Sequence, residues 1–225
     1  MTTLTAAAAA AAAAAPARVL ALLGASGHGK VVADAALAAG WSRVVFFDDA
    51  WPGGSTHARW PTEGGTSELM ARLGEFDGVL VSIGHAAVRV RRQHELPAGG
   101  ASLLCVVHPR ACVSPFAQIG AGSVVMAGAV IQADAQLGEA CIVNTCASVD
   151  HDCHLADGVH VAPGAHLCGD VRVGACSWVG TGAAVRQGIR IGAGATVGAG
   201  AVVVKPVADG QTVAGCPAMP LERRS

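Results

Sequence analysis

A short segment in the second half of the chain concentrates side chains that can carry chemistry. Residues 150–154 read Asp-His-Asp-Cys-His, and two more histidines follow at His160 and His166. Imidazole titrates near neutral pH and transfers protons, whereas imidazole, thiolate and carboxylate groups together are ligands of zinc. The segment is therefore a candidate for proton transfer or for a metal site, depending on its geometry.

A six-residue repeat sets that geometry. From Val113 to Val203 an aliphatic residue falls on every sixth position, and a small or β-branched residue follows four positions later. This period fits a three-sided prism with one short strand per side, so that residues eighteen apart stack in neighbouring coils. The repeated aliphatic residues are Val113, Ile119, Val125, Ile131, Leu137, Val143, Val149, Leu155, Val161, Leu167, Val173, Val179, Val185, Ile191, Val197 and Val203.

The repeat separates the histidines from one another. His154, His160 and His166 are six residues apart, so we expect them on three different sides of the prism, which argues against a shared zinc ion. The eight cysteines contain no Cys-x-x-Cys pair. Cys141 and Cys153 fall on small inward positions, where a thiol packs as a small hydrophobe. We therefore expect reduced structural cysteines and no metal.

The first hundred residues show a different pattern, that of a βαβ unit of the nucleotide-binding kind. Its strand ends should gather at one edge of a small parallel sheet, which is where ligands bind in such folds. The predicted elements are a strand at 18–23, a glycine loop at 24–29, a helix at 30–39, a strand at 43–47 ending in Asp48-Asp49, a strand at 78–83 ending before Gly84, and a further strand at 103–107.

The glycine loop differs from the dinucleotide fingerprint, because it reads Gly-x-x-Gly-x-Gly and not Gly-x-Gly-x-x-Gly. A glycine loop that opens a helix still presents N–H groups to phosphate. Asp48 or Asp49 can accept hydrogen bonds from a base or a ribose. The alternative is that the glycines only turn the chain, but the loop and the acid pair together favour nucleotide binding.

Composition excludes other classes of protein. The 225 residues carry a net charge of −1, and the 15 Lys and Arg residues are scattered, so no nucleic-acid footprint is present. The polyalanine run from Ala6 to Ala15 lacks a basic flank and is too short to span a bilayer, so we expect no membrane insertion. We predict a disordered low-complexity tail at 1–16, a Rossmann-like domain at 17–107, a β-helix at 108–219, a tail at 220–225, and a cytoplasmic location.

The motifs occur in a characteristic order: Gly24 to Gly29, Phe47-Asp48-Asp49, Ile83-Gly84, His108-Pro109, Asn144, Val149 to Asp152, and Gly215 to Ala218. From about Arg18 to Met219 the chain resembles the sugar acetyltransferase family typified by UDP-4-amino-sugar N-acetyltransferases and the related sialic acid O-acetyltransferases. This resemblance implies a Rossmann-like domain that holds a nucleotide sugar, followed by a left-handed parallel β-helix of hexapeptide repeats that binds acetyl-CoA. It also implies a homotrimer.

Acetyl transfer to an amine needs a base, and the resemblance places that base at His151, with Asp152 to orient or tune it. Residues eighteen apart stack, so Gly169 should lie one coil above His151, where its N–H can meet a developing oxyanion. The resemblance independently implies a contact between this amide and the acetyl group. We expect His154 and His166 to be ordinary solvated residues.

The resemblance implies further acetyl-CoA contacts at His160 and at the backbone of Thr181 and Ala199. Lys205 lies near the end of the column and can meet a CoA phosphate, although an ordinary exposed charge explains it equally well. The candidate residues for the nucleotide sugar, with a UDP-amino sugar expected, are Ser26, Gly27, His28, Asp48, Asp49 and Gly84.

Three functions stay open at this point. The first is acetyl-CoA-dependent N-acetylation of a nucleotide-linked amino sugar in surface-glycan or glycoprotein assembly. The second is O-acetylation of sialic acid or a related sugar, and the third is a non-catalytic trimeric scaffold. The pair His151-Asp152 and the glycine loop argue against the third.

Overall fold

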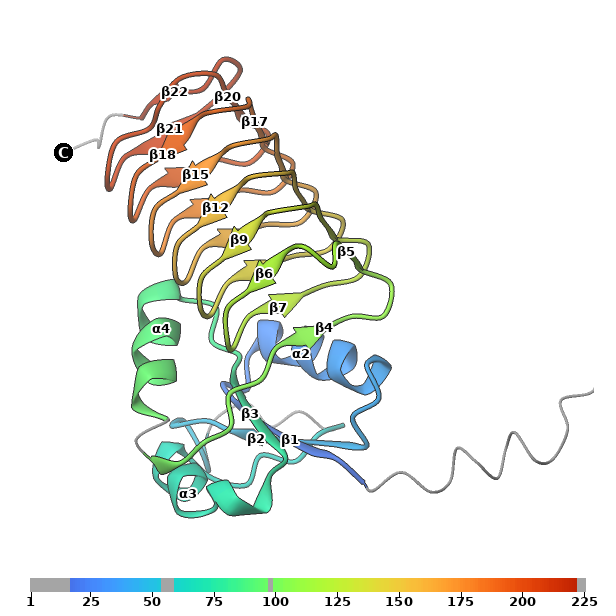
Figure 1. Ribbon diagram of the computed structural model, residues 1–225. Helices are drawn as coiled ribbons and strands as arrows, with labels where there is room; N and C mark the ends of the chain where they lie inside the picture. Colours follow the sequence, from blue (N-terminus) through green and yellow to red (C-terminus); the bar gives the residue numbers. More distant parts are fainter. Residues whose placement is uncertain (1–16, 54–58, 97–98, 222–225) are drawn as a thin grey trace, which may run out of the picture.

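The structure, a computed structural model, describes residues 17–53, 59–96 and 99–221. The predicted tail at 1–16 and residues 222–225 of the predicted C-terminal tail lie outside the described residues. A small α/β domain stands at the base of a long column of coils (Figure 1). This arrangement confirms the predicted fold class of a parallel α/β domain followed by a parallel β-helix.

The α/β domain is built on a three-stranded parallel sheet with the strand order β2-β1-β3. The strands are apolar and almost fully buried, so helices must cover both faces. Leu23 pairs with Phe47 and with Val81, so all three strands end at one edge, as predicted. The elements are β1 (Val19–Leu23), α2 (Gly27–Ala38), β2 (Arg43–Phe47), α3 (Thr66–Ala71), the 3₁₀ helix η1 (Leu73–Glu75), β3 (Gly78–Val81) and α4 (Ala86–Glu95).

The column has three sides, each a sheet whose main strands are parallel and eighteen residues apart, and only the last strand of side 1, β22, pairs antiparallel among the described residues. Side 1 comprises β4 (Val106–Val107), β7 (Val124–Val125), β10 (Ile142–Val143), β13 (His160–Val161), β16 (Trp178–Val179), β19 (Thr196–Val197), β21 (Thr212–Ala214) and β22 (Met219–Pro220). Side 2 comprises β5 (Cys112–Val113), β8 (Val130–Ile131), β11 (Ser148–Val149), β14 (His166–Leu167), β17 (Ala184–Val185) and β20 (Val202–Val203). Side 3 comprises β6 (Gln118–Ile119), β9 (Gln136–Leu137), β12 (His154–Leu155), β15 (Arg172–Val173) and β18 (Arg190–Ile191).

The repeated aliphatic side chains fill the inside of the column, as the sequence predicts. They form one continuous core cluster from Val125 to Val213, with Val113 and Ile119 packed against its lower end. The small inward positions are buried as well, and Cys141 and Cys153 are 1% and 0% exposed. All eight cysteines are free.

The predicted strand at 103–107 is divided between the two parts of the molecule. The sequence assigned residues 106–107 to the α/β domain, but Val106 and Val107 pair with Val124 and Val125 and form the first strand of side 1. Within the predicted strand, Leu103 forms a bridge to the α/β sheet, through Val79. The two-residue strand was misassigned because an apolar pair fits either sheet equally well.

Two helices join the domain to the column. The apolar face of α2 packs on the lower part of side 1, where Val124, Met126 and Ile142 belong to the same core cluster as the helix. Helix α4 follows the corner between sides 3 and 1 (Figure 1), with Gln93 donating to the Ala121 carbonyl at 2.7 Å. The edge of the α/β sheet at which β1, β2 and β3 end is therefore held against the middle coils of the column.

We expect the column core to dominate stability. Leu167→Ala removes a side chain that is 1% exposed and should cost about 2–5 kcal/mol of unfolding free energy. Leu37→Ala, in α2 at 39% exposure, is the control and should cost less than about 1 kcal/mol. Chemical denaturation followed by circular dichroism measures both, and equal losses would contradict the core assignment.

Candidate active site

His151 lies in the turn after β11, at the corner between sides 2 and 3, and its ring packs on Gly169 one coil above. A methyl group added at Gly169 would lie 2.6 Å from Nε2 of His151. This contact confirms the stacking inferred from the repeat. The N–H of Gly169 has no acceptor among the described residues and is available to a ligand.

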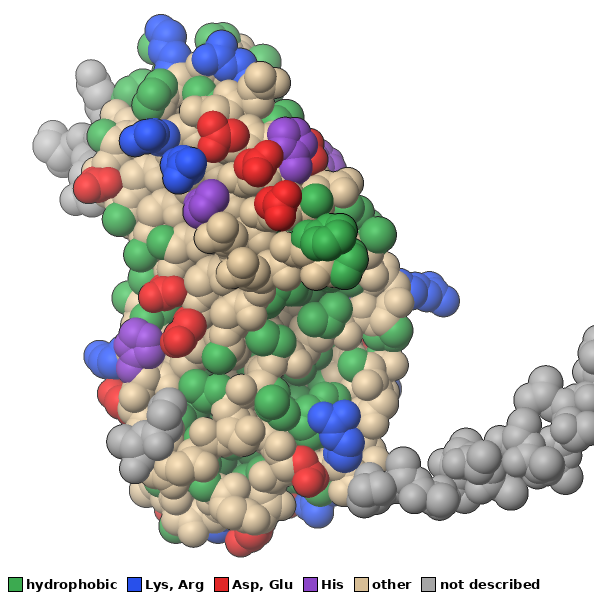
Figure 2. Space-filling view, in the orientation of Figure 1, with side chains coloured by type: hydrophobic (Ala, Val, Ile, Leu, Met, Phe, Trp, Pro, Cys, Tyr) green, Lys and Arg blue, Asp and Glu red, His purple; other side chains and the backbone are tan. Residues whose placement is uncertain are grey.

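Asp152 orients this imidazole. Its carboxylate lies 2.7 Å from Nδ1 of His151, which leaves Nε2, the nitrogen beside Gly169, free to accept a proton. The hydrogen bond that His151 donates to the Asp152 carboxylate raises the pKa of His151, and the charges of Asp150 and Asp170 act in the same direction. Figure 2 shows histidine, acidic and basic side chains gathered over the upper coils, above a less charged lower column.

His160 lies on side 1 in a different environment. Its ring stacks on Trp178 with 5.9 Å between ring centroids, and its Nε2 lies 3.2 Å from Nδ2 of Asn144. The Asn144 amide oxygen accepts from the N–H of Thr145, so Nδ2 must face the imidazole as a donor. Burial, with smaller effects from Arg89 and His28, lowers the pKa of His160 to about 4. The ring is therefore neutral, and Nδ1 carries its proton.

The glycine loop of the α/β domain reaches His160. His28, in the first turn of α2, lies 6.4 Å from His160 between ring centroids. Burial, followed by the charge of Arg89, lowers the pKa of His28 to about 4. Its buried Nε2 has no hydrogen-bond partner among the described residues. Beside these rings a cleft of about 670 Å³ opens between Gly84 and Trp178.

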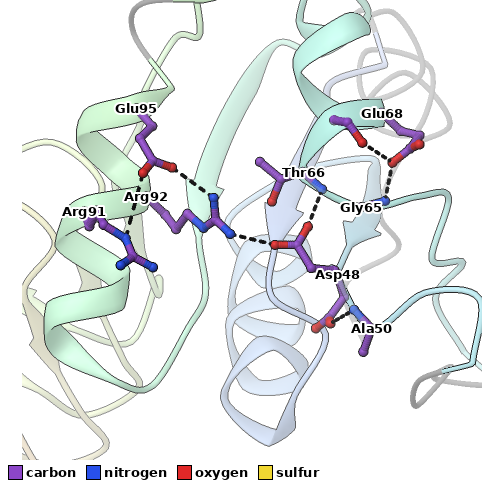
Figure 3. Close-up of polar contacts among 10 residues, drawn as sticks. Asp48, Ala50, Gly65, Thr66, Glu68, Arg91, Arg92 and Glu95 are labelled. Carbon is purple, nitrogen blue, oxygen red and sulfur yellow. Dashed lines mark hydrogen bonds and ion pairs between the residues drawn. The ribbon is translucent and has the colours of Figure 1, made fainter.

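The acids at the end of β2 are already engaged within the chain. Asp48 accepts from the N–H groups of Ala25 and Ala50 at 2.8 and 2.9 Å. Asp49 accepts from the N–H of Thr66, which lowers its pKa, and pairs with Arg92 at 2.7 Å (Figure 3). Both carboxylates hold the strand-end loops in place, and a contact with a nucleotide stays a prediction for each.

The glycines of the loop divide into structural and open positions. Gly24 has a φ of +115°, and Gly29 packs against the Gly24 carbonyl and the Phe46 ring, so both are needed for the turn. A methyl group at Gly27 would meet nothing within 4 Å, and the same holds at Gly84. Gly27 and the exposed Ser26 open helix α2, whose first N–H groups face this edge.

The remaining predicted contacts fall at two corners of the column. Thr181 and Ala199 lie in the turns between sides 1 and 2, and neither N–H has a partner among the described residues. Lys205, exposed, follows β20 at the corner between sides 2 and 3, which is the corner of His151. Whether these residues contact acetyl-CoA stays a prediction.

The three spaced histidines do separate as expected. His154 is on side 3, His160 on side 1 and His166 on side 2. In the part of the chain that the structure describes, no group of His, Cys, Asp or Glu side chains could hold a metal ion.

Sequence reasoning missed two residues of this site. Asn144 entered only as part of a motif, although it fixes the tautomer of His160. Trp178 is 51% exposed and covers one face of that ring. The eighteen-residue register could have placed Trp178 directly above His160, since the two positions pair in neighbouring strands.

A parallel α/β domain with an open ligand edge, joined to a hexapeptide β-helix that carries an oriented surface histidine, defines a hexapeptide-repeat transferase with an N-terminal α/β domain. Residues 19–96 match the family described as the PglD N-terminal domain. No curated protein matches the chain significantly.

Several solved structures are similar over nearly the whole chain. The acetyltransferase domain of PglB from Neisseria gonorrhoeae, in complex with acetyl coenzyme A, is 48% identical, with a TM-score of 0.86, over 91% of this chain and 99% of that one. PerB from Caulobacter crescentus, in complex with CoA and GDP-perosamine, is 35% identical, with a TM-score of 0.86, over 92% and 99%. A histidine-to-alanine variant of the Caulobacter GDP-perosamine N-acetyltransferase gives the same identity and TM-score over 92% and 98%. The chain belongs to the PglD-type sugar N-acetyltransferases.

The stacking of His151 on Gly169 predicts a sharp effect of one methyl group. The backbone of Gly169 does not have a positive φ, so Gly169→Ala should fold, but the methyl group must push the His151 ring aside. We expect acetyl transfer to fall about 100-fold or more, as for a misplaced reacting group. Gly74→Ala, where the added methyl group meets nothing within 4 Å, is the control. Unchanged kcat in Gly169→Ala would exclude this arrangement.

The pair His151-Asp152 predicts a shift in the pH profile. Asp152 favours the imidazolium form of His151, so loss of the Asp152 carboxylate lowers the pKa of His151. A general base becomes active as the pH rises through the pKa of that base. The acid limb of kcat/KM should therefore move to lower pH in Asp152→Asn, with a lower plateau. Asp134→Asn, which also lies at a positive φ in the turn one coil below, should leave the limb in place.

Proposed function

We propose that this protein transfers the acetyl group of acetyl-CoA to the amino group of a nucleotide-linked amino sugar in glycan biosynthesis. The observation that carries the proposal is the Asp152-oriented His151 packed on the free N–H of Gly169. The similarity to an acetyl-CoA complex and to a nucleotide-sugar complex supports both halves of the reaction.

The residues divide the chemistry as follows. Acetyl-CoA supplies the acetyl group as a thioester. Nε2 of His151 takes a proton from the attacking amine, and Asp152 stabilises the resulting imidazolium at Nδ1. The N–H of Gly169 donates to the carbonyl oxygen as negative charge develops there. The imidazolium then returns the proton to the departing CoA sulfur, so the base is regenerated.

The α/β domain holds the nucleotide sugar in this proposal. The open edge at Gly27 and Gly84 receives the diphosphate, while His28 and the neutral His160 lie at the entrance to the column. A GDP-sugar is bound in the Caulobacter relative, whereas the sequence resemblance pointed to a UDP-sugar. O-acetylation of sialic acid lacks a comparable supporting observation.

The site further supports a cyclic trimer with shared active sites. His151 and Gly169 lie at one corner of side 2, whereas Thr181, Ala199 and the adjoining side 1 with His160 lie at the other. One acetyl group cannot reach both corners of a single column. If side 2 of each of three columns faces a common threefold axis, the His151 corner of each copy lies beside the His160 side of the next copy.

We also propose a cytoplasmic location, where acetyl-CoA and nucleotide sugars are made available together. Among the described residues, the helices are all too short or too polar to cross a bilayer.

The direct test is a thiol-release assay with acetyl-CoA and a panel of UDP-, GDP- and CMP-linked sugars with free amines. His151→Ala should lower turnover about 10²–10⁴-fold with the fold intact, because a general base is lost. His154→Ala, three residues away on side 3, is the matched control. Unchanged turnover in His151→Ala would leave a scaffold as the better description, and a response to free sialic acid alone would favour O-acetylation.

Mixed assemblies test the shared site. His151→Ala and His160→Ala should each be impaired alone, but after refolding together they should recover about one quarter of the wild-type sites, since each site needs one intact corner from each of two neighbours. Separate refolding followed by mixing is the control. The absence of any recovery in co-refolded protein would contradict the shared arrangement.

A further inference from the structure

Helix α4 carries a buried cation that the mechanism above does not use. Arg89 is 1% exposed, and no carboxylate pairs with it in the described part of the chain. Its guanidinium instead donates to four backbone carbonyls: Nε to Ala140 at 2.8 Å, Nη1 to Ile83 and Gly84 at 2.9 Å each, and Nη2 to Gly158 at 2.9 Å.

These carbonyls belong to two different parts of the molecule. Ile83 and Gly84 follow β3 at the ligand edge, whereas Ala140 and Gly158 lie in successive turns of the corner between sides 3 and 1. Arg89 therefore fixes the ligand edge to the coils beside His160. The close approach requires Gly158, since a methyl group there would lie 2.6 Å from the Val90 side chain.

A buried guanidinium is costly unless an anion balances it, because carbonyl dipoles satisfy its hydrogen bonds without cancelling its charge. The uncancelled charge extends across the cleft: it contributes to the lowered pKa of both His28 and His160. A positive potential that disfavours imidazolium ions favours a phosphate in the same space.

The other ionisable groups near Arg89 do not neutralise it. Those facing it are Cys141 and Cys176 from the corner turns, His28 from α2 and His160 from side 1. Burial raises the pKa of Cys141 to about 12, so this thiol is uncharged. The nearby Asp157 carboxylate accepts from the N–H of Glu139 at 2.8 Å and from no arginine among the described residues.

We propose that Arg89 is a positioning residue whose buried charge, acting without direct contact, draws the diphosphate of the nucleotide sugar to the edge formed by the glycine loop and Gly84. The inference rests on the proposed function, because it takes a nucleoside diphosphate as the ligand of this edge. Arg92 nearby, which is partly buried, is already paired with Asp49 and Glu95.

The experiment compares charged and uncharged ligands. Isothermal titration of UDP, GDP, uridine and guanosine is made on full-length wild type, Arg89→Met, Arg89→Gln and Arg89→Lys. The two neutral variants should bind the diphosphate about tenfold more weakly, while nucleoside and acetyl-CoA affinities change little, as expected for one charge acting through protein. Arg89→Lys should keep most of the diphosphate affinity. Arg91→Met, an exposed position on the same helix, is the control.

A second measurement is made on Arg89→Gln, in case Arg89→Met does not fold. The glutamine amide can still donate to two of the carbonyls. Histidines labelled at Cε1 should titrate at higher pH in Arg89→Gln than in wild type at His28 and His160, and not at His154. Equal loss of nucleoside and diphosphate affinity, or unchanged histidine titration, would overturn the inference alone. Wild type that binds neither UDP nor GDP would overturn the proposed nucleotide-sugar substrate, and the inference with it.

Discussion

The hydrogen bonding between parallel coils, in a register of eighteen residues, is the constraint on which the rest of the structure depends. It sets which side chains meet across coils: His151 meets Gly169 because the two positions are one coil apart, and His160 meets Trp178 for the same reason. These contacts do not depend on loops from distant parts of the sequence meeting in the fold. They follow from a strand spacing of about 4.8 Å repeated through the column, so the site is as rigid as the sheet that carries it.

Two histidines in this scaffold have pKa values shifted in opposite directions. His151 is exposed, and the Asp152 carboxylate raises its pKa, which suits a group that must hold a proton briefly. His160 is enclosed by Trp178, Asn144 and the α/β domain, and burial lowers its pKa, so the ring is neutral, accepts from Asn144 at Nε2 and carries its proton on Nδ1. Environment, not residue identity, separates a base from a neutral donor here. Only the first of these environments is visible as a neighbour in the sequence.

Repetition made the column predictable, and its absence limited the prediction elsewhere. The sixfold pattern places the core, separates His154 from His166, and sets Gly169 over His151. It says nothing of how α4 meets a corner, because that contact depends on backbone carbonyls, which every residue has. For the same reason Arg89 gave no signal in the sequence. Asp48 looked free for a ligand because its partners, the N–H groups of Ala25 and Ala50, have no signature in residue type.

The docking of α4 along the corner brings two periodic structures side by side. Gln93 and Arg89 contact successive turns of the column, so one turn of helix is matched to about one coil. A helix rises about 5.4 Å per turn and the coils about 4.8 Å each, so the two scales drift apart by about 0.6 Å per turn. Over the ten residues of α4 the drift stays near 2 Å, which side chains can absorb. A longer helix would accumulate more drift and would lose its register with the turns of the column.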